Sequence, residues 1–262
     1  MRKILTKNYT VPRKENPSII VIHYTANESL DSVINTFQNP NSKASAHYCV
    51  DINGDTIQLV DEQNIAWHAG QSSWNGRTGI NQYSIGIELV NFGWGIVENG
   101  NLTRDNIVSM FVPISPIDGR ESTKHFSWSP YCLPQTVSLF CLVQDIMVRN
   151  NIGLENVVGH EHVSPALKLD PGPAFRDIWL GFQQHVTIGS KWGNEHSIVA
   201  STQSHCNRLG SKLTVDEIWG SKTQQAIVDI FRKFSIPYCL PSIKLDASNC
   251  KQVNTLMKAI LG

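Results

Sequence analysis

The sequence lacks long apolar runs, an excess of charge of one sign, and a leader-like start. Its longest apolar runs, such as residues 19–22, are far shorter than the roughly 18–20 residues of a membrane-spanning helix, so no membrane span is expected. Lys and Arg number 22 and Asp and Glu also number 22, and this balance argues against a nucleic-acid partner. Residues 1–16 are basic but contain neither the apolar stretch nor the cleavage site of a secretory signal.

Closely paired cysteines are also absent. The six cysteines include no Cys-x-x-Cys pair, which excludes a zinc ribbon. We expect buried free thiols, with a disulfide among the later cysteines as the alternative. Hydrophobic residues at 41% and charged residues at 17% are sufficient for a packed core and argue against general disorder.

Apolar runs and helical patterns alternate through most of the chain, which predicts an α/β fold. Strands are expected at residues 18–24, 46–51, 56–60, 65–70, 84–91 and 157–160. Helices are expected at residues 29–37, 134–150 and 174–185. Residues 92–133 show no clear period and predict a long loop that borders the site. The predicted architecture is a mixed central β-sheet flanked by helices.

A change in composition near residues 189–195 predicts a domain boundary, because the chain becomes polar and contains glycine there. We therefore expect a catalytic domain over residues 1–192. A small C-terminal helical domain is expected over residues 197–262, with helices at residues 222–234 and 248–261.

Two histidines and one aspartate have the character of metal ligands. His23 and His160 each follow an apolar run and precede a polar segment, which places them at the rim of the predicted sheet. Asp170 follows ten residues after His160, in a backbone stiffened by Pro171 and Pro173. Zn²⁺ favours such nitrogen and oxygen donors, and three protein ligands leave the fourth position that a catalytic site needs.

Five motifs occur in an order that resembles a known family. They are Ile22-His23-Tyr24-Thr25, Ser45-Ala46-His47-Tyr48, Ala66-Trp67-His68-Ala69-Gly70, the strand 84–91, and residues 156–173. Together they resemble the zinc-dependent N-acetylmuramoyl-L-alanine amidases of the type-2 amidase family, which are relatives of the peptidoglycan recognition proteins. The resemblance covers residues 18–180.

The resemblance implies a reaction and a role for each matching residue. It implies that His23, His160 and Asp170 bind Zn²⁺, that Glu88 is the catalytic carboxylate and that Lys168 assists. The bond expected to be cut joins the lactyl group of N-acetylmuramic acid to L-alanine in peptidoglycan or a muropeptide. The chemistry agrees, because zinc lowers the pKa of bound water to about 7 and a desolvated carboxylate suits proton transfer.

Several further residues are candidates for substrate contact. Trp67 and His68 lie at a strand end that opens on a glycine-rich segment, and Asn91 ends the strand that carries Glu88. For His68 a purely local hydrogen bond is the alternative, and His47 is expected to be structural. His162 follows His160 by two residues and remains open as a supporting partner, a substrate contact or a competing metal ligand.

Residues 213–227 show a second resemblance, to small helical peptidoglycan-binding domains. Glu217 stands where those domains usually carry glycine, and a helical cap that packs on the first domain is the alternative. A wall-binding tail favours the cell envelope, the periplasm or non-classical secretion, whereas the missing signal favours the cytoplasm. The alternatives to an ordinary amidase are a non-catalytic recognition module, an antibacterial effector and a phage lysin. An inhibitory or immunity protein and the oligomeric state are left open.

Overall fold

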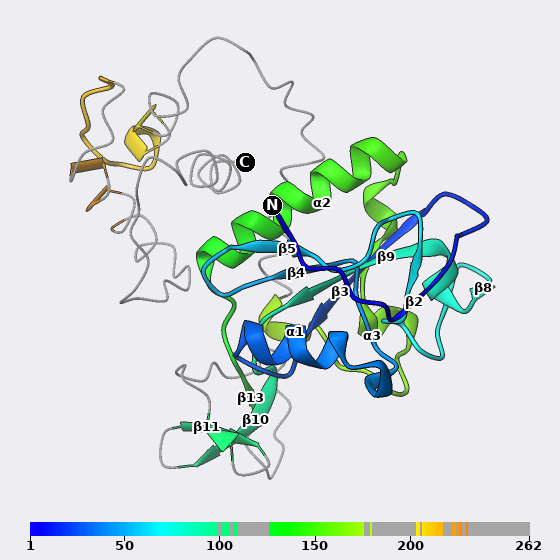
Figure 1. Ribbon diagram of the computed structural model, residues 1–262. Helices are drawn as coiled ribbons and strands as arrows, with labels where there is room; N and C mark the ends of the chain where they lie inside the picture. Colours follow the sequence, from blue (N-terminus) through cyan, green and yellow to red (C-terminus); the bar gives the residue numbers. More distant parts are fainter. Residues whose placement is uncertain are drawn as a thin grey trace.

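The computed structural model has a central β-sheet with helices on both of its faces (Figure 1). The structure describes residues 1–98, 101–104, 107–108, 126–175, 179, 203–204, 206–216, 222–223, 225–226 and 229. Most of the predicted helix at 174–185 and most of the predicted domain 197–262 lie outside this range, so the domain boundary stays a prediction. In the described part of the chain, no helix is both long enough and apolar enough to cross a bilayer.

The central sheet is mixed in direction, as the sequence predicts, and it has six strands. Its order is β1 (Arg2–Lys3), β5 (Thr56–Gln58), β4 (Tyr48–Val50), β9 (Ser84–Leu89), β3 (Ile19–Tyr24) and β14 (Val157–Gly159). The neighbours β4, β9, β3 and β14 run parallel, whereas β5 pairs antiparallel with β4 in the expected hairpin. The central strands β3 and β9 read as continuous apolar runs because helices cover both of their faces.

Side chains alternate between two buried layers on either side of this sheet. Ile20 and Ile22 of β3 pack with helix α2 (Leu133–Asn150), whereas Ile19 and Val21 belong to a separate cluster on the other side. Helix α1 (Leu30–Gln38) also packs on that other side, and its first turn is capped by Ser29 Oγ, which accepts from the Ser32 amide. By this alternation His23 lies on the face opposite α2.

The predicted strand at 65–70 is observed only at residues 65–66, three further short strands were not predicted, and one change falls at the site. Two-stranded pairs join β2 (Tyr9–Thr10) to β6 (Ile65–Ala66), and β7 (Ser73–Trp74) to β8 (Arg77–Thr78). Single 3₁₀ turns are η1 (Pro40–Ser42), η2 (Ile80–Tyr83) and η3 (Leu154–Asn156). His160 opens the short helix α3 (His160–Val163) instead of ending the strand.

The prediction of a loop over residues 92–133 is wrong for much of its described part, which forms a second sheet. That sheet is antiparallel, in the order β12 (Ile107–Val108), β11 (Asn101–Arg104), β10 (Trp94–Glu98) and β13 (Phe126–Trp128). Strands of two to five residues are too short to show a period in the sequence, which is why pattern reading missed them. We call residues 94–128 the insertion.

The cysteines are of two kinds. Among the described cysteines, Cys49 and Cys206 are buried free thiols, in agreement with the first expectation. Cys132 is disulfide-bonded, so the expectation of free thiols is wrong for this residue.

Candidate active site

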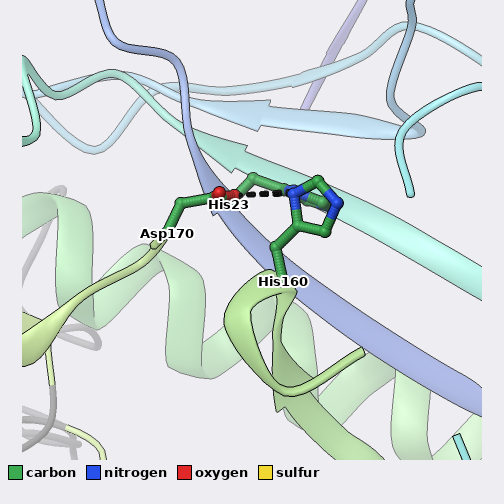
Figure 2. A group of neighbouring side chains, drawn as sticks. All are labelled: His23, His160 and Asp170. Atoms are coloured by element: carbon green, nitrogen blue, oxygen red, sulfur yellow. Dashed lines mark hydrogen bonds and ion pairs between the residues drawn. The ribbon is translucent and has the colours of Figure 1, made fainter. Parts of the chain in front are cut away.

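Three side chains that are distant in sequence meet at the C-terminal end of the parallel strands. His23 is on β3, His160 opens α3, and Asp170 lies on the segment that follows α3, as Figure 2 shows. The two histidine Nδ1 atoms are 3.0 Å apart, and each lies 3.0 Å from Oδ2 of Asp170. All three residues are buried, and together they form a group that could hold a metal ion.

The geometry of this cluster fits a small divalent ion. Tetrahedral zinc with bonds of about 2.0–2.1 Å to nitrogen and oxygen places its ligands about 3.3 Å from one another. The observed triangle of 3.0 Å sides is close to that spacing. Two imidazoles and one carboxylate form a borderline donor set, and they supply three of the four ligands of a tetrahedral ion.

Both histidines offer Nδ1 to the cluster, because each Nε2 has another partner. His23 Nε2 lies 3.0 Å from Nδ1 of His68, and His160 Nε2 lies 3.3 Å from the carbonyl oxygen of Ala69. Burial lowers the pKa of His23, which favours the neutral imidazole that a metal requires. Burial alone would raise the pKa of Asp170, but the close contacts of its Oδ2 with the imidazoles of His160 and His23 hold that pKa well below its usual range, so this carboxylate is ionised.

Glu88 stands beside the cluster because of strand register. It pairs with His23 across β9 and β3, so the two side chains share one face of the sheet. Burial and the charge of Asp170 raise the pKa of Glu88 to about 8, while Lys168 opposes the shift. Its Oε2 atom is buried and has no hydrogen-bond partner among the described residues. A carboxyl group with such a pKa can both accept and donate a proton near neutral pH.

A cavity of about 530 Å³ opens over the cluster. It is lined by predicted site residues, namely His23, Trp67, His68, Glu88, His160, Lys168 and Asp170. Lys168 is exposed, so its ammonium group is available at the mouth. The insertion contributes Trp94 and Arg104 to the same cavity. Sequence reasoning missed Arg104, because the short strand that carries it gave no signal.

Asn91 is the predicted site residue that does not line this cavity. Its side chain is buried and donates to the carbonyl of Pro130, while its Oδ1 accepts from the amide of Gly93. These bonds hold together the two ends of the insertion. A substrate contact of Asn91 stays a prediction, and the cavity gives it no support.

The two remaining histidines near the motifs lie apart from the metal cluster. His162 is exposed, and its Nδ1 accepts from the amide of Gly159 at 3.0 Å. His47 is fully buried, accepts from the amide of Gly86 through Nδ1, and has Nε2 3.2 Å from the carbonyl of Asn64. These contacts give His47 the structural place expected from the sequence.

The burial of His47 predicts how the stability of the fold depends on pH. Burial, assisted by the charge of Arg13, lowers the pKa of His47 to about 3, whereas an unfolded histidine titrates near 6.5. The unfolded chain therefore takes up a proton that the folded chain does not, and stability falls as pH drops from about 6.5 toward 3. We expect His47→Gln to remove up to about 1.4 kcal/mol per pH unit from this slope.

The measurement is the free energy of unfolding of metal-free protein from urea titrations at several pH values between 7 and 4. Equal slopes for wild type and His47→Gln would show that His47 is not held neutral in the folded state.

The fold and the cluster define a class: a mixed α/β protein with a buried cluster of two histidines and one aspartate that could hold a metal ion, in a cavity that also contains a carboxyl group suited to proton transfer. The family described as N-acetylmuramoyl-L-alanine amidase matches residues 13–173. The chain belongs to this family.

Individual relatives agree with this assignment. N-acetylmuramoyl-L-alanine amidase AmiD of Escherichia coli (strain K12) is 38% identical over 164 residues, which are 60% of this chain and 49% of AmiD. The chain thus spans about half the length of that relative. The 1,6-anhydro-N-acetylmuramyl-L-alanine amidase AmpD of Citrobacter freundii is 26% identical over 72% of this chain and 91% of its own.

A solved structure of a relative shows the same fold. A crystal structure of a selenomethionine AmpD derivative superposes with a TM-score of 0.50 at 24% identity, covering 69% of this chain and 93% of AmpD. A complex of E. coli AmiD with anhydro-N-acetylmuramic acid-L-Ala-D-γ-Glu-L-Lys gives a TM-score of 0.49 at 27% identity, covering 94% of this chain and 89% of that one.

Proposed function

We propose that the protein is a zinc-dependent N-acetylmuramoyl-L-alanine amidase, which hydrolyses the amide between the lactyl group of N-acetylmuramic acid and L-alanine. The observation that carries this proposal is the buried cluster of His23, His160 and Asp170 beside Glu88 at the base of the cavity. Family membership supports the choice of bond, and the relatives AmiD and AmpD carry this activity in their names.

His23, His160 and Asp170 would hold the ion, and this chain's other residues would move the protons. When bound, zinc acts as a Lewis acid and lowers the pKa of a coordinated water to about 7. Glu88 takes the proton of the attacking water and passes it to the amine nitrogen that leaves with L-alanine. Lys168 places its ammonium near the carbonyl oxygen, where negative charge develops.

The alternative from another class is a recognition module that binds muropeptides without cutting them. A binding module needs neither a metal cluster nor an unpartnered carboxylate oxygen buried beside it, and this chain has both. An antibacterial effector or a phage lysin would use the same chemistry and differ only in delivery. The ligand cluster and the unpartnered carboxylate oxygen therefore favour a hydrolase over a recognition module.

The test is the release of stem peptides from purified cell-wall sacculi, measured by mass spectrometry. We expect release by the zinc-loaded protein, a fall of at least about 100-fold after chelation, and recovery on addition of Zn²⁺, because a catalytic metal supplies several kcal/mol of transition-state stabilisation. Soluble anhydro-muropeptides assayed in parallel decide between polymer and fragments as substrate. No release with any metal would favour the recognition module.

We also propose that residues 197–262 bind the cell wall, on the resemblance of residues 213–227 to peptidoglycan-binding domains. Binding there would raise the local concentration of polymer around the catalytic site. The Glu88→Gln variant of the full chain should co-sediment with sacculi even when excess muropeptide fills the catalytic cavity. If muropeptide releases the protein completely, the cavity alone binds the wall. A wall-binding tail favours action in the cell envelope, and cell fractionation would test that location.

A further inference from the structure

The His68 ring lies against the sheet between His23 and Ser84. Its ring occupies the space above Gly86 of β9, where a β-carbon would overlap the imidazole. Its Nδ1 is 3.0 Å from Nε2 of His23, and its Nε2 is 3.0 Å from Oγ of Ser84. Both ring nitrogens are therefore committed to protein partners, and a substrate could reach only the carbon atoms of this ring.

The direction of these hydrogen bonds follows from the contact that Ser84 makes on its other side. Ser84 Oγ lies 2.7 Å from the carbonyl oxygen of Ile80. Because a carbonyl oxygen can only accept, the serine hydroxyl donates its single proton to it. Ser84 Oγ must then accept from His68, which places the proton of His68 on Nε2. A neutral imidazole protonated at Nε2 has an acceptor at Nδ1.

The same logic continues to His23. Because Nδ1 of His68 is an acceptor, the proton of His23 lies on Nε2 and points to His68. The Nδ1 atom of His23 is then unprotonated and directed at Asp170 and His160. This is the one neutral form of His23 that can coordinate a metal through Nδ1.

His160 is oriented by the same segment of chain. Its Nε2 faces the carbonyl of Ala69, which directly follows His68. The amides of His68 and Ala69 both donate to Oδ1 of Asn81, at 3.1 and 2.7 Å, so this stretch is clamped to the turn that also carries Ile80. One small assembly thus supports both imidazole ligands.

We propose that His68 and Ser84 are positioning residues that fix the tautomer and ring orientation of His23, through the hydrogen-bond chain His23–His68–Ser84–Ile80, so that its Nδ1 is ready for the metal. The metal in question rests on the proposed function. This role assigns the Ala66–Gly70 motif to the metal site and separates His68 from the substrate contacts predicted for it.

The first test needs neither substrate nor metal. In metal-free protein labelled with ¹⁵N-histidine, long-range ¹H–¹⁵N spectra report which nitrogen of each ring carries the proton. We expect both His23 and His68 to be protonated at Nε2 in the wild type. A His23 protonated at Nδ1, or an even mixture of the two forms, would overturn the proposal.

The second test removes the anchor and measures Zn²⁺ affinity by competition with a chromophoric chelator. Ser84→Ala should shift His23 toward the Nδ1-protonated form and weaken zinc binding about 10-fold, since outer partners of metal ligands contribute about 10–100-fold. His68→Phe keeps an aromatic ring over Gly86 but can neither donate nor accept, and it should cost about 100-fold.

Ser129→Ala is the matched control, because it removes another buried serine hydroxyl, one that has no partner among the described residues. It should leave both the tautomer and the zinc affinity at wild-type values. Zinc affinity within twofold of wild type in Ser84→Ala and His68→Phe would refute the positioning role. Because no readout uses peptidoglycan, failure of the amidase proposal in the sacculus assay would be seen separately.

Discussion

Replacing Glu88 by glutamine is expected to abolish turnover while the metal stays bound. Glu88 is not one of the three clustered ligands, so the variant should keep a full equivalent of zinc by elemental analysis. A glutamine amide cannot accept the proton of the attacking water or return it to the leaving amine. General acid–base catalysis contributes about 10²–10⁴-fold, and stem-peptide release from sacculi should fall by that range.

Glu161→Gln is the matched control for Glu88→Gln. Burial also raises the pKa of Glu161, to about 7, and Asp170 contributes in both cases, but Glu161 does not line the cavity. We expect its release of stem peptide to stay within about threefold of wild type, as for a substitution that removes no transition-state contact. Near wild-type hydrolysis by zinc-loaded Glu88→Gln would remove Glu88 from the mechanism.

The second large effect is expected for His160→Ala, which should lose both the metal and the activity. The substitution takes one nitrogen from a three-membered cluster, and of the candidate ligands among the described residues it leaves Asp170 and His23. Zinc affinity should fall by more than about 100-fold, which is the largest effect expected from losing a residue that only supports a metal ligand. Zinc stoichiometry after gel filtration, together with stem-peptide release, measures both consequences.

His162→Ala supplies the comparison for this variant, because His162 lies two residues further along but is exposed and bonded to the Gly159 amide. It should bind zinc as the wild type does. If His160→Ala keeps a full equivalent of zinc and His162→Ala loses it, the ligand is His162 and the cluster of Figure 2 is not the metal site.

The strands that carry the site could be predicted because parallel strands covered on both faces are apolar throughout. Residues 18–24 and 84–91 stood out for this reason, and the structure places β3 and β9 within them. The pairing of Glu88 with His23 across β9 and β3 could not be predicted, because the register of two parallel strands is set by packing between distant segments.

The residues that contact His68 could not be predicted from the sequence either. A glycine inside a strand pattern signals close approach of another group, and Gly86 is such a glycine, with the His68 ring against it. This signal shows that something packs there but not which side chain. For Asn91 the sequence suggested a contact that the structure does not support. This residue lies in a matching motif, yet its side chain contacts backbone groups of residues 93 and 130.

The paired ends of the insertion have a consequence for engineering. Trp94 and Trp128 face each other across β10 and β13, and the Ser129 amide donates to the carbonyl of Gly93 at 2.8 Å, so the segment leaves and re-enters the main body at nearly one point. A piece of chain attached in this way can be exchanged as a cassette. Grafting other segments between residues 93 and 129 should remodel one wall of the cavity while the catalytic groups on the central sheet keep their positions.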